Sequence, residues 1–273
     1  MSVSVIIPYT NRKEKILRAL SSVLNQTSTD LEVLVIDDAS EIPFKYNRDP
    51  RVRVIRNAVR KGPAGCRNIG MAHSKGRYIA FLDPADYWSP EFLEKTTAAL
   101  LENPAACMAC ANGYELNEKE EKLRLHRDES KELTTILPDI LTSGRQWRTS
   151  GSLWRREAVE NLRWPDFHPR FDYAFDMAVA VENNRIAGLK DPLVFYDMDG
   201  GDKSLDENRM LAEKLIVLQY ISDTLYASKW RKDREVLMGI RYVFLTSFKD
   251  YTNEQDLKTL ARIFRPWNGL LGK

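Results

Sequence analysis

Cysteine is scarce in this sequence. The 273 residues include three cysteines, too few for a fold that depends on disulfides. Two of them, Cys107 and Cys110, form a C-x-x-C pair inside the small apolar segment AACMACA. We interpret this segment as a buried strand, because a redox-active thiol needs an exposed setting that lowers its pKa. No second C-x-x-C and no histidine pair accompanies it, so a zinc site is not expected.

Long apolar runs are also missing. No run approaches the roughly 18–20 residues that span a bilayer, and the first residues, SVSVIIP, have neither a basic region nor a small-residue cleavage site. We therefore expect a cytoplasmic protein, with peripheral contact to the inner face of the membrane left open. Neither G-x-G-x-x-G nor G-x-x-x-x-G-K-[ST] is present, so a dinucleotide fold and a P-loop are both unsupported.

An excess of charge of one sign is absent as well. The 41 basic and 39 acidic residues leave a formal net charge of +2, which excludes a protein that coats nucleic acid over its whole surface. The charge is unevenly distributed, however. Residues 229–273 contain ten Lys or Arg and five Asp or Glu, a net charge of +5, together with seven aromatic residues. Contact with an anionic membrane surface, packing against the rest of the chain and a homo-oligomer interface remain alternatives for this segment.

Short β-rich runs alternate with helical periodicity in the first half of the chain. The expected strands cover residues 3–7, 31–36, 51–55 and 78–82. The expected helices between and after them cover residues 13–25, 63–74 and 89–103. This order predicts an α/β fold with a mostly parallel, doubly wound sheet and helices on both faces.

The second half is less regular. We expect a hairpin or surface excursion over 115–127, helices over 131–142 and 172–183, and a helical pattern from residue 206 onward. We place a catalytic domain at 1–204, divided into 1–112 and 113–204, and a C-terminal helical region at 205–273.

Polar residues follow three of the predicted strands. The first strand ends in Pro8-Tyr9-Thr10-Asn11-Arg12, the second in Asp37-Asp38, and the strand over 78–82 in Asp83-Pro84-Ala85-Asp86. Ligands of open α/β sheets bind at the carboxyl ends of strands. Carboxylates gathered there suit a ribose or base edge, or a divalent cation that also binds a diphosphate.

At these positions the chain resembles a known family. The strings SVIIPYTNR, VLVIDDAS and GPAGCRNIGMAHSKGRYIAFLDPADYWSPEFL are similar to family 2 glycosyltransferases of the GT-A fold, closely over residues 2–100 and weakly to about 204. The resemblance implies transfer of a sugar, with inversion, from a nucleoside-diphosphate sugar to a glycan or lipid-linked acceptor in surface polysaccharide synthesis. A UDP-sugar is the favoured donor, and residues 1–112 and 113–204 become the donor and acceptor halves.

The resemblance also assigns the residues that hold the donor. They are Pro8, Tyr9, Asn11, Arg12, Asp37, Asp38, Arg67, Asn68 and Asp83.

The usual acidic motif of the family departs from its pattern here. D-x-D-D reads Asp83-Pro84-Ala85-Asp86, so the position that commonly binds the metal has no side-chain oxygen. A Mn²⁺ or Mg²⁺ ion would then depend on Asp83, Asp86 or Asp199, or be held mainly by the diphosphate. In the third alternative metal binding is weak or absent, and basic residues neutralise the leaving group.

The resemblance implies a general base at the start of the helix over 172–183. Asp176 is assigned to take the proton of the acceptor hydroxyl, with Asp172 as the alternative. In the purely structural interpretation, Asp172 caps the helix and Asp176 faces solvent. Two other functions stay open. A nucleotidyltransferase would carry a glycine-rich basic loop, which PYTNRKEK lacks, and Ala85 and Phe175 are compatible with a catalytically impaired binding protein.

Overall fold

The computed structural model describes residues 2–11, 13–117, 119–128, 132–166, 171–198, 207–247, 250 and 253–270, without the side chains of 207–213. Contacts divide the chain into two compact units. Unit 1 comprises Met1–Thr134, Trp147–Trp164 and Arg185–Gly201, and unit 2 comprises Thr135–Gln146, Pro165–Asn184 and Asp202–Lys273. The functional boundaries expected from the sequence stay a prediction.

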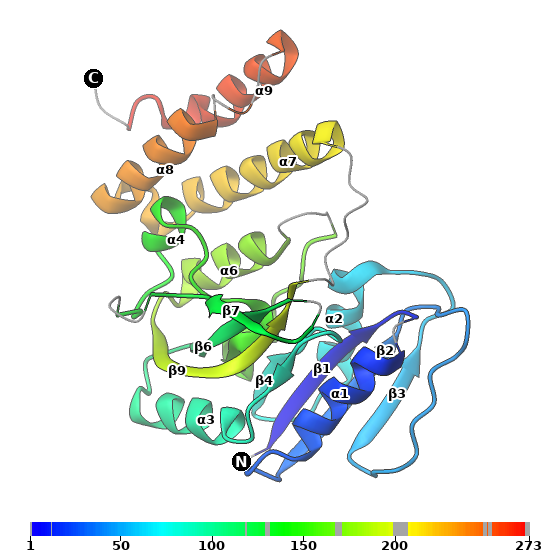
Figure 1. Ribbon diagram of the computed structural model, residues 1–273. Coiled ribbons are helices and arrows are strands. Elements are labelled where there is room, and N and C mark those ends of the chain that lie inside the picture. The colour runs from blue at the N-terminus through cyan, green and yellow to red at the C-terminus, as the bar shows by residue number, and fades with distance from the viewer. Residues whose placement is uncertain are drawn as a thin grey trace. The chain divides into compact units, whose positions relative to one another are not determined.

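Unit 1 is built on one sheet (Figure 1). Its strands are β1 (Val3–Tyr9), β2 (Leu31–Asp37), β3 (Val52–Arg56), β4 (Tyr78–Phe81), β5 (Tyr87–Trp88), β6 (Met108–Leu116), β7 (Lys122–Leu125), β8 (Ser152–Arg155) and β9 (Ile186–Asp197). They lie in the order β3-β2-β1-β4-β8-β6-β9-β5, and β7 pairs with β6. The expected α/β fold is confirmed.

The direction of the strands changes across this sheet. β3, β2, β1 and β4 are parallel, as expected, and β6 is parallel to β9. β8 is antiparallel to both β4 and β6, β5 is antiparallel to β9, and the hairpin expected over 115–127 is the antiparallel pair β6–β7. The sheet is therefore mixed, because hairpins and short reversals replace helical crossovers after β4.

Helices cover both faces of the parallel part. α1 (Lys13–Leu24) and α3 (Phe92–Glu102) bury their apolar residues in one cluster with Val5 and Ile7 of β1. α2 (Gly62–His73) packs on the other face, where a Cβ on Gly70 would lie 2.3 Å from Ile6. Successive residues of a strand point to opposite faces, so Val5 and Ile6 contact different helices. Residues 149–151 form η1 (Thr149–Gly151), and α5 (Arg156–Val159) follows β8.

The C-x-x-C segment is structural. Cys107 directly precedes β6 and Cys110 lies in it, and both side chains are fully buried and form no disulfide. The helix expected over 131–142 is wrong for most of its length, because among the described residues 132–142 only α4 (Asp139–Thr142) is helical. The carbonyls of Leu133 and Thr134 instead accept hydrogen bonds from the amides of Gly188 and Ile186, so this segment runs beside β9.

Unit 2 is helical. It contains α4, α6 (Phe171–Glu182), α7 (Glu207–Tyr226), η3 (Lys229–Lys232), α8 (Arg234–Ser247), α9 (Glu254–Phe264) and η5 (Arg265–Trp267). α6 and α9 pack on α7, and α4 packs on α8. Trp267 is fully buried and its indole N–H donates to Ser222 Oγ at 2.8 Å. None of the helices that the structure describes is both long and apolar enough to cross a membrane.

Candidate active site

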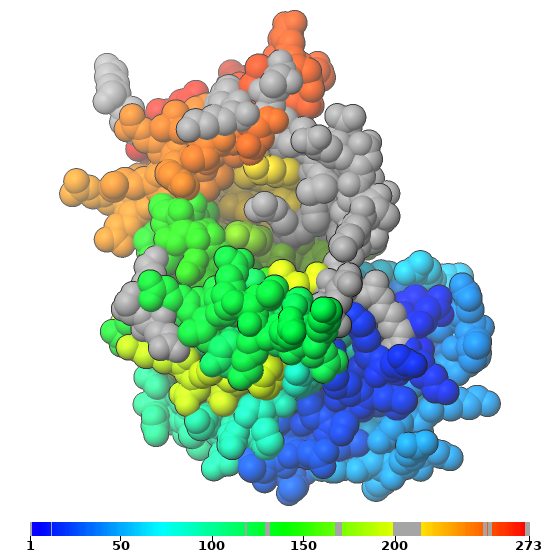
Figure 2. Space-filling view, in the orientation of Figure 1, coloured from blue at the N-terminus to red at the C-terminus, as the bar shows by residue number. Residues whose placement is uncertain are grey.

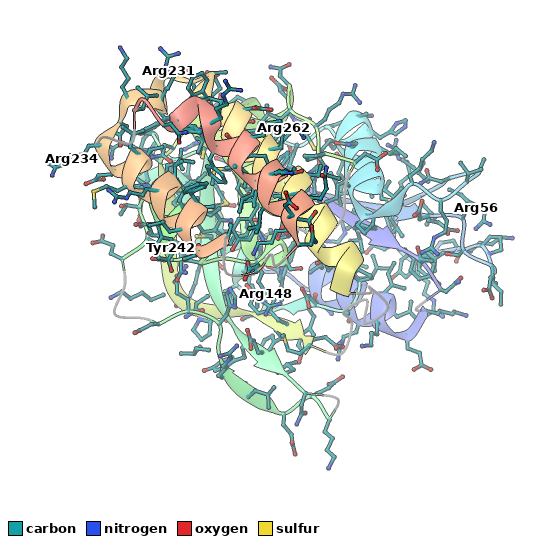
Figure 3. The ribbon with its side chains drawn as sticks, turned by 90° about the horizontal axis from the view of Figure 1, so that it is seen from above. Arg56, Arg148, Arg231, Arg234, Tyr242 and Arg262 are labelled. Atoms are coloured by element: carbon teal, nitrogen blue, oxygen red, sulfur yellow. The ribbon has the colours of Figure 1, made fainter. Side chains whose placement is uncertain are left out.

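Asp37 closes β2 and holds the loop that follows it. Its fully buried carboxylate accepts hydrogen bonds from the amides of Ser40 at 2.9 Å and Phe44 at 3.0 Å, and from Arg56 Nη1 at 2.6 Å. Burial raises the pKa of Asp37, but these hydrogen bonds outweigh it and leave the pKa below its ordinary value. Asp37 is therefore an ionised anchor for the loop. Figure 3 shows Arg56 at the edge formed by β3.

Asp38 organises the next loop. One carboxylate oxygen accepts from Asn57 Nδ2 at 2.9 Å and from the amide of Lys61 at 2.7 Å, and the other accepts from the amide of Gly62 at 2.9 Å. Gly62 begins α2 and has a φ of +70°, a conformation that favours glycine. Asp38 thereby fixes the start of α2 beside the end of β2.

Tyr9 and Asn11 continue the same edge from β1. The Tyr9 carbonyl accepts from the amide of Asp38 at 2.9 Å, and its buried ring packs on Phe44 with centroids 4.8 Å apart. Burial, and secondly the charge of Asp37, raise the pKa of Tyr9. The exposed Asn11 accepts at Oδ1 from the amide of Glu41 at 2.9 Å. Pro8 pairs with Ile36 inside the sheet.

Arg67 and Asp83 connect α2 to the end of β4. Arg67 Nη2 donates to Asp83 Oδ1 at 2.6 Å; the Arg67 side chain is 3% exposed and that of Asp83 is 44% exposed. The guanidinium lies 4.6 Å from the ring centroid of Trp164, in a cation–π contact. Asn68 holds Trp164 in place, donating to its carbonyl at 2.9 Å and accepting from its amide at 2.8 Å. Asp83 thus presents an oriented carboxylate at the surface.

Asp86 points inward, away from that surface. One oxygen accepts from Ser150 Oγ at 2.6 Å and the other from the amide of Asp197 at 3.0 Å. Ser150 Oγ also accepts from the amide of Asp83 at 3.1 Å. Burial, and secondly the charge of Asp83, raise the pKa of Asp86 to about 7.

Basic side chains surround the turn at Ala85. Arg18 Nη2 donates to the Ala85 carbonyl at 2.7 Å and to Asp197 Oδ2 at 3.0 Å, and Lys15 Nζ lies 2.7 Å from the same Asp197 oxygen. The Arg18 guanidinium also lies 4.6 Å from the ring centroid of Tyr87. α1 therefore supplies positive charge next to the position where the family motif has a carboxylate.

These contacts test whether the residues suit a divalent cation. Ala85 has no side-chain oxygen, both oxygens of Asp86 accept hydrogen bonds from the protein, and Asp83 is paired with Arg67. Within the described parts of the chain, no group of three or more His, Cys, Asp or Glu side chains could hold a metal ion. The described residues do not assemble the carboxylate set that the motif implies, so no step below depends on a cation. The assignment of Asp83 and Asp86 as ligands stays a prediction.

The candidate base lies in unit 2. Asp176 on α6 is fully buried, and its Oδ2 accepts from Arg145 Nε at 2.6 Å. Asp172, the alternative base, keeps a side chain that is 30% exposed and accepts from Arg145 Nη1 at 3.1 Å. Burial lowers the pKa of Arg145, but the charges of Asp176 and Asp172 outweigh it and raise the pKa above its ordinary value. Asp176 does not face solvent, and both carboxylates are ion-paired; their catalytic assignment stays a prediction.

Two assigned residues, Arg12 and Asp199, lie outside the described residues. Several residues that build the site were not foreseen, among them Ser150, Asp197 and Asn57. Ser150 and Asp197 lie far along the chain from Asp86, whereas Asn57 directly follows β3 and the strand-end rule could have found it.

A family model and several curated proteins are similar to this chain. The family model described as glycosyl transferase family 2 matches residues 4–163. UDP-Glc:alpha-D-GlcNAc-diphosphoundecaprenol beta-1,3-glucosyltransferase WfgD of Escherichia coli is 37% identical over 110 residues, which are 39% of this chain and 44% of WfgD. WfaP, with the same enzyme name and organism, is 43% identical over 91 residues, 32% of this chain and 36% of WfaP. The match therefore spans less than half the length of either relative.

The fold comparison agrees with this result. The crystal structure of S. aureus TarS 1–349 in complex with UDP-GlcNAc superposes with a TM-score of 0.75 at 18% identity, over 99% of this chain and 82% of that one. That similarity establishes the GT-A fold. Because the family model covers more than half of the sequence and includes the ends of β1, β2 and β4, the chain belongs to glycosyl transferase family 2.

Proposed function

We propose that this chain transfers a sugar from a UDP-sugar to a lipid-linked glycan, with inversion at the anomeric carbon, at the cytoplasmic face of a membrane. The observation that carries the proposal is that Asp37 and Asp38 at the end of β2, and Asp83 after β4, lie at the carboxyl ends of two parallel strands that both pair with β1, inside the segment that matches the family. The names of WfgD and WfaP, which contain UDP-Glc and a diphosphoundecaprenol-linked sugar, support this choice of donor and acceptor.

Asp38 is our choice for the base of the nucleotide. Asn57 Nδ2 and the amides of Lys61 and Gly62 fix the orientation of its carboxylate, and a fixed carboxylate is a suitable acceptor for the single imide N–H of uracil. Asp37, with Tyr9 packed on Phe44, shapes the wall beside it. Pro8, Asn11 and Arg12 remain assigned to the same pocket.

Asp83 is our choice for the ribose. Its Oδ1 is held by Arg67, and its side chain is nearly half exposed, so it can accept from a sugar hydroxyl without first losing its orientation. Arg67 and Asn68 stay assigned along the donor, where both also hold Trp164.

The chemistry is a single displacement. Asp176, or Asp172 in its place, accepts the proton of the acceptor hydroxyl as that oxygen bonds to the anomeric carbon. The bond from the anomeric carbon to the diphosphate oxygen breaks on the opposite face, and the nucleoside diphosphate leaves with the electron pair.

A transfer assay with the purified chain tests this function. We expect label from UDP-glucose or UDP-GlcNAc to appear on GlcNAc-diphosphoundecaprenol, and proton NMR of the product to show an anomeric configuration opposite to that of the donor. Asp38→Asn should weaken UDP binding about 10–100-fold, because a charge-assisted hydrogen bond contributes roughly 1.5–3 kcal/mol. The matched variant Asp30→Asn, which changes a carboxylate just before β2, should bind UDP normally. Transfer from GDP-sugars alone would contradict the choice of donor.

The departure at Ala85 favours a second candidate, a nucleotide-sugar-binding protein without transferase activity. Isothermal titration and the transfer assay together separate the two. Saturable binding of a UDP-sugar, with neither transfer to a lipid-linked acceptor nor hydrolysis of the donor, would favour the binding protein.

A further inference from the structure

An exposed face of α8 combines apolar and basic side chains. We define the α8 face as Arg234, Met238, Arg241, Tyr242 and Leu245. Each of these residues lies three or four positions from another member of the set, so all five share one side of the helix. All five are exposed, and the side chains of Met238, Tyr242 and Leu245 are 62%, 49% and 55% exposed. Figure 3 shows Arg234 and Tyr242 along α8, and Figure 2 shows α8 in orange, with part of its surface uncovered.

The opposite side of α8 already holds the helix in unit 2. Val236, Gly239 and Ile240 are buried there. A Cβ on Gly239 would lie 2.9 Å from Leu141 of α4, so the two helices approach closely. The α8 face is therefore not needed for packing within the unit, and its three large apolar side chains require another explanation.

Positive charge extends from the α8 face to η3. Residues 229–247 contain five basic and two acidic residues. One of the acidic residues, Asp233, is used as a helix cap, since its Oδ1 accepts from the amides of Glu235 and Val236 at 3.0 Å. Lys229 and Lys232 are exposed, and Arg231 lies with its guanidinium 5.2 Å from the ring centroid of Tyr226.

Other parts of the C-terminal segment do not share this character. Phe264 and Trp267 are buried within unit 2, and the Trp230 indole donates to the Ala180 carbonyl at 3.1 Å, so these aromatic residues serve packing. α9 carries two basic and two acidic residues, of which Lys258 and Glu254 pair at 2.6 Å, whereas α8 carries two arginines and one glutamate, Glu235. The combination of exposed apolar side chains with excess positive charge belongs to α8.

We propose that the α8 face docks on the surface of an anionic lipid bilayer. Met238, Tyr242 and Leu245 enter the boundary between headgroups and acyl chains, and Arg234 and Arg241 contact lipid phosphates. A second copy of the chain is the less favourable occupant. A two-fold interface would bring the same arginine-rich face of both copies together, and like charges would repel. The proposal concerns a surface of unit 2 and does not depend on the donor, the acceptor or transferase activity.

Vesicle co-sedimentation of the full chain tests the proposal. We expect binding to vesicles of phosphatidylglycerol and phosphatidylethanolamine, much weaker binding to phosphatidylcholine vesicles, and a decrease as salt is raised. The double variant Arg234→Gln/Arg241→Gln should bind the anionic vesicles about 25-fold more weakly, since each basic residue contributes about fivefold. Arg234→Lys/Arg241→Lys should retain most of the binding.

Two further variants separate the α8 face from general positive charge. Met238→Ser/Leu245→Ser should also weaken binding, whereas Lys258→Gln/Arg262→Gln, which removes two exposed charges from α9, should leave it nearly unchanged; Figure 3 shows Arg262 on that helix. Equal binding to neutral and anionic vesicles would overturn the proposal. An equal loss of vesicle binding in Arg234→Gln/Arg241→Gln and in Lys258→Gln/Arg262→Gln would also overturn it. A third contrary result would come from sedimentation velocity. If the wild-type chain is a dimer and the α8 variants are monomers that still bind vesicles normally, the α8 face is a dimer interface.

Discussion

The Ser150 hydroxyl donates a hydrogen bond to Asp86 at 2.6 Å and, through the same oxygen, accepts one from the amide of Asp83 at 3.1 Å. Ser150 thus turns the last carboxylate of the acidic motif away from the surface that Asp83 faces. Two carboxylates three residues apart consequently have different environments, one partly exposed and one buried with a pKa of about 7.

Asp86→Asn should remove a pH dependence of stability. The folded-state pKa of about 7 lies above the ordinary value of 3.8, so the stabilising contribution is fully present below pH 3.8 and is lost as the pH rises to about 7. Between pH 4 and 7 the free energy of unfolding of the wild-type protein should therefore fall by up to about 1.4 kcal/mol per pH unit more than that of the variant. Urea denaturation at several pH values measures the difference. Parallel curves for the two proteins would contradict it.

Glu115→Gln should have the opposite pH signature. Burial raises the pKa of Glu115, but hydrogen bonds from Arg124, His126 and Arg148 outweigh burial and lower it from 4.5 to about 2. The contribution is therefore present above pH 4.5 and is lost as the pH falls toward 2. We expect the variant to be about 3 kcal/mol less stable than wild type at pH 7, with a smaller difference at pH 3. The exposed control Glu102→Gln should change stability by less than about 0.5 kcal/mol at either pH.

Asp176→Asn should destabilise the protein as well as abolish transfer. Removing one partner of a buried ion pair costs about 3–5 kcal/mol, because Arg145 would keep its charge without its closest partner. Asp172→Asn should cost less, since that side chain is partly exposed. Thermal unfolding and the transfer assay measure the two effects.

Stability and catalysis at Asp176 can be separated by replacing both members of the pair. Arg145→Met/Asp176→Leu should regain much of the stability that Asp176→Asn loses, since apolar residues of similar size can replace a buried ion pair. It should still lack transferase activity. A folded double variant that transfers sugar at the wild-type rate would exclude Asp176 as the base and favour Asp172.

Ala85→Asp should increase the response of the protein to Mn²⁺. The substitution restores a charged carboxylate at the third position of the motif, and carboxylates suit Mn²⁺ and Mg²⁺, whereas the amide of asparagine brings no negative charge. In thermal-shift measurements with UDP, added Mn²⁺ should stabilise the variant more than wild type, and Ala85→Asn should behave nearly as wild type. An equal Mn²⁺ effect on all three proteins would show that residue 85 does not decide cation binding.

Local sequence predicted the parallel half of the sheet and the polar edge of the site. β1, β2 and β4 are β-branched or apolar runs whose ends carry Tyr9, Asp37 and Asp83. Parallel strands bring their carboxyl ends to one edge, so these residues could be placed together without a structure. The hairpin β6–β7 was also predictable from its local pattern.

Contacts between distant residues decided the remainder. Asp86 turns inward because Ser150, 64 residues later, lies beside it, and Asp176 is buried because Arg145 reaches it from another segment. Leu133 is not helical as predicted, and its carbonyl instead accepts a hydrogen bond from the amide of Gly188 in β9. Backbone pairing with a distant strand outweighs a weak helix propensity here. By itself the sequence determined the family, the strand-end residues and the missing oxygen at Ala85. Only the tertiary structure decided which carboxylates face solvent and which tail residues stay exposed on α8, since burial depends on segments that local patterns do not bring together.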